Sequence, residues 1–129
     1  KWVIAPTTTI VRRFRQACPG VPVIGFPRGA GDLYLEYARD TGVDCVGLDS
    51  TVSLSFIKDT LQPVCTVQGN LDNQILVAGG QALDEQTTRI LEALTPGPFI
   101  FNLGHGVLPE TPPDHVARVV GLIREWTGA

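Results

Sequence analysis

The stretch FIFNLGHGVLPETPPDHV, residues 99–116, joins an apolar run to the start of a helix. The run at 98–104 is short, continuous and rich in strand-forming residues, which is typical of a strand buried on both faces. The helix start is indicated by a possible cap at Thr111 and by Pro112, because proline is favoured at the first helical position. The apolar residues of this helix recur at helical spacing, at Val116, Val119, Val120 and Ile123. The stretch therefore predicts one strand followed by one helix.

The same unit occurs three more times upstream. Apolar runs at 21–26, 44–49 and 63–69 predict three further strands, and a helix-period segment follows each of them. A further helix precedes the first run and ends at Pro19-Gly20; its apolar stripe consists of Ile10, Val11, Phe14 and Ala17. Strands that alternate with helices in this way are joined by right-handed crossovers. The sequence therefore predicts an α/β fold with four parallel strands.

Short polar residues and glycines predict where the other helices begin and end. The expected caps are Thr7 to Thr9 for the first helix, Asp32 for the second, Ser50 or Thr51 for the third, and Asp84 for the second half of the fourth. Gly42 is expected to end the second helix, and Gly79-Gly80 to divide the fourth. The expected buried stripes are Leu54, Ile57 and Leu61 in the third helix, and Thr87, Ile90, Leu91 and Leu94 in the fourth.

Four parallel strands form either an open sheet or half of an eight-stranded barrel. No GxGxxG turn follows the first strand and no switch point is evident, which favours the barrel. In both folds, ligands meet the residues at the carboxyl ends of the strands. Here those residues are polar or glycine after every run: Pro27, Arg28 and Gly29; Asp49; Gln68, Gly69 and Asn70; and Asn102, Gly104 and His105. They form a candidate binding rim.

The composition is that of an ordinary globular chain. It has 129 residues, 43% of them apolar, and a net charge of -3, which gives no electrostatic reason to expect nucleic acid or an anionic membrane as a partner. No apolar run reaches membrane-spanning length and no secretory leader is seen, so we expect a cytoplasmic protein. The three cysteines, Cys18, Cys45 and Cys65, lack metal or redox spacing and are expected to be reduced.

Several segments resemble one family, the uroporphyrinogen decarboxylases. The similar segments are IGFPRGAG, VGLD, VQGNLD, LVAGG and, above all, FNLGHGVLPETPPDHV. The resemblance implies a (β/α)8 barrel and a homodimer. It further implies that residues 1–129 are a single segment, the carboxyl-terminal half of the barrel with its last four strands. The absence of methionine and the start at Lys1 agree with a piece of a longer chain.

The resemblance also implies a reaction that uses neither metal nor organic cofactor. In the family, the four acetate side chains of uroporphyrinogen III lose carbon dioxide and coproporphyrinogen III is formed, with a protonated pyrrole ring as the electron sink. The principal catalytic aspartate, the arginine-rich substrate motif and an active-site tyrosine belong to the amino-terminal part of the family. The catalytic residues are therefore expected upstream of Lys1, and Asp49, Arg28 and Tyr34 are not their counterparts.

One rim residue, His105, has a role implied by the resemblance: contact with a carboxylate side chain of the substrate. An imidazole with an unperturbed pKa of about 6.5 can donate to a carboxylate in its neutral or its charged form. Without the resemblance, the alternative for a lone histidine is a structural role or simple exposure to solvent. His115, in the first turn of the last helix, is expected to face solvent.

The remaining rim residues have two possible roles each. Asp49 is expected to hold a loop backbone, or else to orient a group of the substrate. Gln68 and Asn70 either line the mouth or shape a tight loop. Outside the rim, Arg12, Arg13 and Arg15 are expected to form a solvated helix face.

Two other functions compete with this one. A zinc- or cobalamin-dependent barrel methyltransferase would place a cysteine near 104–106, but the cysteines of this chain lie elsewhere. The other possibility is a half-barrel with no activity of its own, because half of a barrel has two free strand edges and an open apolar face. We therefore expect the segment to fold natively only with its missing half or a partner, and to be inactive alone.

Overall fold

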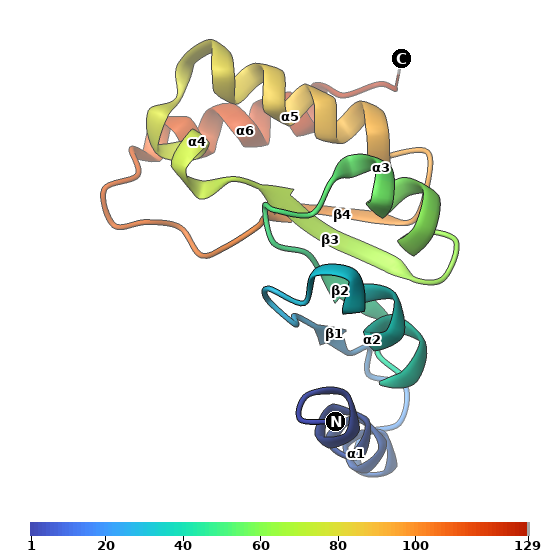
Figure 1. The fold of residues 1–129 in the computed structure, drawn as a ribbon. Helices are drawn as coiled ribbons and strands as arrows, with labels where there is room; N and C mark the ends of the chain where they lie inside the picture. The colour runs from blue at the N-terminus through green and yellow to red at the C-terminus, as the bar shows by residue number, and fades with distance from the viewer. Residues whose placement is uncertain (129) are drawn as a thin grey trace.

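The computed structural model describes residues 1–128, and it contains one parallel sheet of four strands (Figure 1). The strands are β1 (Ile24–Gly25), β2 (Cys45–Gly47), β3 (Thr66–Leu71) and β4 (Phe99–Leu103). They lie in sequence order, β1-β2-β3-β4, and each pair is parallel. All four predicted strands and their direction are confirmed. The third begins and ends later than expected, so Gln68 lies within β3 and not at its end.

Helical segments precede, separate and follow the strands. They are α1 (Ile4–Ala17), a 3-10 turn η1 (Gly31–Leu33), α2 (Tyr34–Asp40), α3 (Leu54–Phe56), a π-helix η2 (Ile57–Leu61), α4 (Asn73–Ala78), α5 (Gly80–Leu94) and α6 (Pro113–Glu125). The predicted division of the fourth segment is confirmed, because Gly79 and Gly80 have φ values of 68° and 64°. Gly42, at φ 76°, follows α2 as expected. No helix among residues 1–128 is both long and apolar enough to span a bilayer.

The predicted cap of the first helix is wrong. Helix α1 begins at Ile4, so Thr7 to Thr9 lie inside it, and the hydroxyls of Thr8 and Thr9 donate to the carbonyls of Ile4 and Ala5. Proline at position 6 does not prevent this early start, since the N–H groups of a first helical turn have no helical acceptor.

The other predicted caps are also wrong. Ser53, not Ser50 or Thr51, caps α3, because Thr51 bonds to Asp49. Asp32 lies within η1, and Asp84 lies inside α5, where it pairs with Arg118. The cap of α6 is displaced by one residue, from Thr111 to Pro112.

Helices cover one face of the sheet and leave the other face exposed. Val46, Val67 and Leu71 are buried together with apolar residues of the helices, such as Leu83 and Leu94. The opposite face carries Gly47, Gln68 and Ile100 in one register row. On that face Ile24 and Phe26 are each 49% exposed and Ile100 is 44% exposed. Successive parallel strands with helices on one side are the arrangement of part of a (β/α)8 barrel, whose interior is the uncovered face.

A further expectation concerns His115, on the outer surface. His115 does not simply face solvent: its Nδ1 lies 2.8 Å from the carbonyl oxygen of Leu76, and its ring occupies the space that Gly79 leaves by lacking a side chain. It therefore joins α6 to the end of α4.

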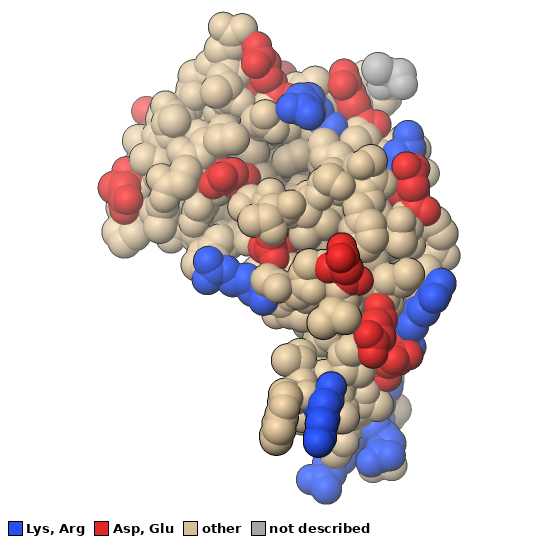
Figure 2. Space-filling model, viewed as in Figure 1, with Lys and Arg blue, Asp and Glu red and all other residues tan. Residues whose placement is uncertain are grey.

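The basic side chains of α1 lie at the end of the molecule that this helix forms (Figure 2). Arg12 and Arg13 are exposed, as expected. Arg15 instead reaches back to Asp44 and to the carbonyl of Gly42, each at 2.8 Å. The guanidinium of Arg15 lowers the pKa of Asp44. The three cysteines are free thiols, as expected, and burial raises the pKa of Cys45 to about 11.

Candidate functional site

The loops at the carboxyl ends of all four strands meet along one edge of the sheet, as parallel strands require. Two of the cavities there are lined by His105. The first, the sheet cavity, measures about 370 Å³ and lies over the uncovered face, with Gln68 and Asn102 among its lining residues. The second, the loop cavity, measures about 460 Å³ and is lined by Arg28, Asp49 and Asn73 among others. Most of the predicted rim residues are therefore brought together.

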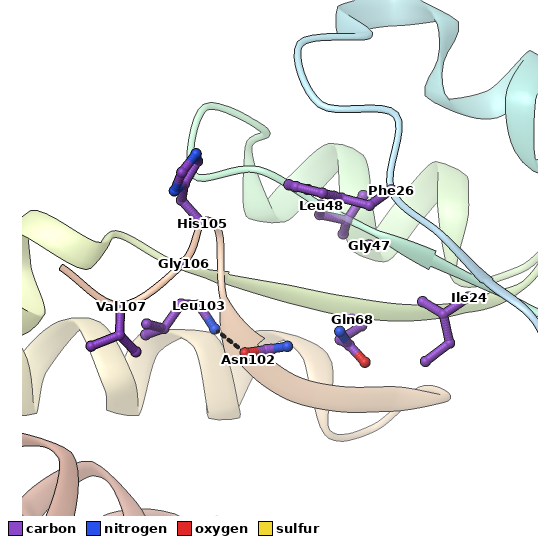
Figure 3. Close-up of a pocket in the computed structure, with 10 residues that line it drawn as sticks. All are labelled: Ile24, Phe26, Gly47, Leu48, Gln68, Asn102, Leu103, His105, Gly106 and Val107. Atoms are coloured by element: carbon purple, nitrogen blue, oxygen red, sulfur yellow. Dashed lines mark hydrogen bonds between the residues drawn. The ribbon is translucent and has the colours of Figure 1, made fainter. Parts of the chain in front are cut away.

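His105 lines both cavities. Figure 3 shows it on the loop that follows β4, with Asn102 and Leu103 of that strand below it. From the other side of the sheet cavity come Ile24, Phe26 and Leu48. Because its side chain is exposed, the imidazole is open to a ligand in either cavity.

The backbone on both sides of His105 is held by the preceding βα unit. The N–H of Gly104 donates to the carbonyl of Leu71 at 2.7 Å. The Asn73 amide donates to the carbonyl of Gly106 at 2.9 Å. Asn73 was not predicted as a site residue; the only signal for it is its place just after the QGNLD segment, where α4 begins. The histidine thus stands on a loop that is fixed at both ends.

The two glycines beside His105 differ in how much space surrounds them. A Cβ atom on Gly104 would collide with the backbone N of Ser50, and would lie 2.9 Å from its Cα and 3.0 Å from the carbonyl carbon of Asp49. Gly106 has open space at the same point, with no heavy atom within 4 Å. Only Gly104 is required for close packing, and this packing sets the β4 loop directly against the β2 loop.

Asp49 is buried, at 5% exposure, and joins three segments by hydrogen bonds. Its Oδ2 accepts from the Gly29 N–H and from the Tyr34 hydroxyl, each at 2.8 Å. Its Oδ1 accepts from the Thr51 N–H at 3.0 Å and from the Thr51 hydroxyl. Burial by itself raises the pKa of Asp49, but these hydrogen bonds outweigh it and lower the pKa to about 2. The expectation that Asp49 holds a loop backbone is confirmed.

The pKa of Tyr34 moves in the opposite direction. Burial raises it well above its usual value, and the hydrogen bond to Asp49 adds to the rise. Tyr34 therefore stays a neutral phenol and donates to the carboxylate.

The two amides of the third strand have separate roles. Asn70 is buried, and its side-chain amide donates to the carbonyls of Asp49 at 3.0 Å and of Val52 at 2.8 Å. It therefore supports the β2 loop. Gln68 lines the sheet cavity with Asn102, whose own Oδ1 accepts from the Leu103 N–H (Figure 3). Gln68 and Asn102 thus place amide groups on the floor of this cavity.

The site suits an anionic or hydrogen-bonding ligand. Arg28 and His105 line one cavity, and an arginine guanidinium or an imidazole N–H forms charge-assisted bonds to a carboxylate. Across residues 1–128, no three His, Cys, Asp or Glu side chains are grouped as they would be to hold a metal ion.

Comparison with known proteins gives a consistent result. The family description of uroporphyrinogen decarboxylase (URO-D) matches residues 1–126. A uroporphyrinogen decarboxylase of Rhodospirillum rubrum is 55% identical over 124 residues, which are 96% of this chain and 36% of that protein. Those of Rhizorhabdus wittichii and a Chelativorans species are 52% and 54% identical over similar lengths. The chain spans about a third of the length of these relatives. Because the family description covers nearly every residue, the chain belongs to the uroporphyrinogen decarboxylase family.

Proposed function

We propose that this chain is part of an enzyme that removes carbon dioxide from the four acetate side chains of uroporphyrinogen III and forms coproporphyrinogen III, in porphyrin biosynthesis. The observation that carries the proposal is the identity to decarboxylases across 96% of the chain. The polar cavities at the strand ends support it, because a substrate with many carboxylates needs such donors. A barrel methyltransferase is not favoured by these matches.

Within that enzyme, residues 1–129 form the carboxyl-terminal half of one barrel. The residues that stabilise the protonated pyrrole ring lie upstream of Lys1, in the half that completes the barrel, and the reaction uses no cofactor. The enzyme is a cytoplasmic homodimer. The uncovered sheet face, with Ile24 and Ile100 half-exposed, supports the need for the other half.

The role proposed for His105 is to bind a substrate carboxylate. Its exposed ring lies where the two cavities meet, on a loop fixed by Leu71 and Asn73. An imidazole has an N–H donor in its neutral form as well as in its charged form, so either form can bind a carboxylate.

The experiment uses a hybrid enzyme, defined as the Rhodospirillum rubrum relative with its matching 124-residue segment replaced by this chain. The hybrid is expected to form coproporphyrinogen from uroporphyrinogen at a rate close to that of the parent relative. A hybrid that is folded by circular dichroism but inactive would contradict the proposed function.

In the hybrid enzyme, His105→Ala is expected to raise KM by about tenfold, because a hydrogen bond to a charged group contributes about 1.5 to 3 kcal/mol. His105→Gln keeps an N–H donor and is expected to recover part of the loss. The measurement is the steady-state KM and kcat for uroporphyrinogen. An unchanged KM in His105→Ala would rule out the carboxylate contact.

A further inference from the structure

The Asp49 carboxylate has no acceptor position left for a substrate. A carboxylate offers about four lone-pair sites on its two oxygens. Four donors approach Asp49: the Gly29 N–H, the Tyr34 hydroxyl, and the N–H and hydroxyl of Thr51. The group is also buried. An oxygen whose lone pairs are all occupied cannot take a proton from a reacting molecule without first breaking one of these bonds.

These bonds join loops of different βα units. Gly29 lies in the loop after β1, next to Arg28, and Thr51 lies in the loop after β2. Asn70 of β3 then holds the backbone of the β2 loop through the carbonyls of Asp49 and Val52. One carboxylate thus sets the distance between the first loop and the second.

The β2 loop in turn supports His105. Gly104 packs on the backbone of Asp49 and Ser50 so closely that no side chain fits between them. A displacement of the β2 loop would therefore displace Gly104 and the adjacent His105. Arg28, Asp49 and His105 are all lining residues of the loop cavity.

We propose that Asp49 is a positioning residue: by holding the Gly29 loop against the Thr51 loop, it fixes the separation of Arg28 and His105 across the loop cavity so that a substrate carboxylate is bound between them. The inference rests on the proposed function. Arg28 is thereby a carboxylate ligand in addition to His105, and Asp49 takes no part in proton transfer.

The test measures KM, kcat and the pH profile of kcat for variants of the hybrid enzyme. Asp49→Asn keeps the acceptor for Thr51 but places an amide NH₂ against the Gly29 N–H, so the first loop is released. The expected result is a KM about tenfold higher, with kcat within about threefold of the unaltered hybrid and an unchanged pH profile.

The matched control is Asp72→Asn. Asp72 directly follows β3, and its carboxylate caps α4 by accepting from the Gln74 N–H at 2.8 Å. Asparagine is an equally good cap, so KM and kcat are expected to stay unchanged. An effect of Asp49→Asn that Asp72→Asn lacks would therefore be due to the buried carboxylate of Asp49, and not to the loss of any aspartate at the end of a strand.

A second pair of variants covers the case in which Asp49→Asn does not fold. Thr51→Val removes one hydroxyl donor to Asp49 and is expected to raise KM by about threefold, whereas Thr51→Ser restores that donor and is expected to return KM to its original value. Because valine is close in shape to threonine, the effect of Thr51→Val on KM reports the lost hydroxyl and not a change in packing.

Four results would overturn the proposal. A lower melting temperature with KM unchanged in Asp49→Asn and Thr51→Val would show a merely structural role. A fall in kcat of about 100-fold or more, with a limb of the pH profile lost, would show a proton-transfer role. A folded but inactive unaltered hybrid would remove the proposed function and this role together, whereas an active hybrid with unchanged variants would remove only this role.

Discussion

The isolated 129-residue chain is expected to form no measurable coproporphyrinogen and to be insoluble or associated when it is produced alone. In the proposed enzyme, the groups that stabilise the protonated ring lie outside this chain. What the chain itself contributes is a rim of donors such as His105 and Arg28. A rim can bind carboxylates, but it does not supply a place for the electron pair that carbon dioxide leaves behind.

The association follows from the sheet. Strands β1 and β4 are its two edges, and within residues 1–128 each has a row of backbone groups with no neighbouring strand. The face between them exposes Ile24, Phe26 and Ile100. Burial of apolar surface contributes about 25 cal/mol per Å², so this face favours contact with another chain. The unpaired backbone groups of the two edges favour such contact as well.

The decisive comparison is co-production with the rest of the Rhodospirillum rubrum relative as a separate chain. The two pieces are expected to co-purify and to show activity, measured by coproporphyrinogen formation and by size-exclusion chromatography. A monomeric isolated chain that unfolds cooperatively and turns over substrate at the rate of the intact relative would contradict both the assignment of the missing residues and the need for a second half.

Gly104→Ala in the hybrid enzyme is expected to lower kcat/KM by about 100-fold, since displacement of a binding group by about 1 Å has an effect of that size. The added methyl group would meet the backbone of Ser50 and Asp49. Neither can easily move, because Asp49 is held by four hydrogen bonds and Asn70 holds its carbonyl. The strain is expected to lower the free energy of unfolding by about 1 to 3 kcal/mol.

Gly106→Ala is the matched control, on the other side of His105. Its added methyl group meets nothing within 4 Å, so kcat/KM is expected to change by less than about threefold. Steady-state kinetics and thermal unfolding of the two variants provide the measurement. Equal effects at the two positions would show that the loop lacks the close packing seen here.

The strands could be predicted from the sequence because each is a short, continuous apolar run, and all four runs are confirmed, although one face of the sheet is uncovered in this chain. The helix starts could not. Several short polar residues stand near each start, and tertiary contacts select among them: Thr51 bonds to Asp49, which leaves Ser53 as the cap. The π-helix at Ile57–Leu61 has no signal in the periodicity.

The site was predictable in its residue types but less so in their roles. Parallel strands present their carboxyl ends to a ligand, and this rule predicts that Arg28 and His105 lie close together. The structure confirms that both line one cavity. Asn70 and Gln68 look alike in sequence, yet one supports a loop and the other lines a cavity. His115 was wrongly expected to face solvent, because its partner, the Leu76 carbonyl, lies 39 positions away in the chain.

The network around Asp49 determines where related enzymes can be recombined. The Asp49 side chain bonds to Gly29, Tyr34 and Thr51, and Asn70 holds the Asp49 carbonyl. These residues come from three consecutive βα units, so a crossover between 29 and 70 would combine partners of different ancestry. The contact of the last unit is different, because Gly104 meets only main-chain atoms of Ser50 and Asp49. A crossover in the turn at 95–98 would therefore preserve the Asp49 network as long as the incoming segment carries glycine at position 104, because that contact depends on no side chain of the other parent.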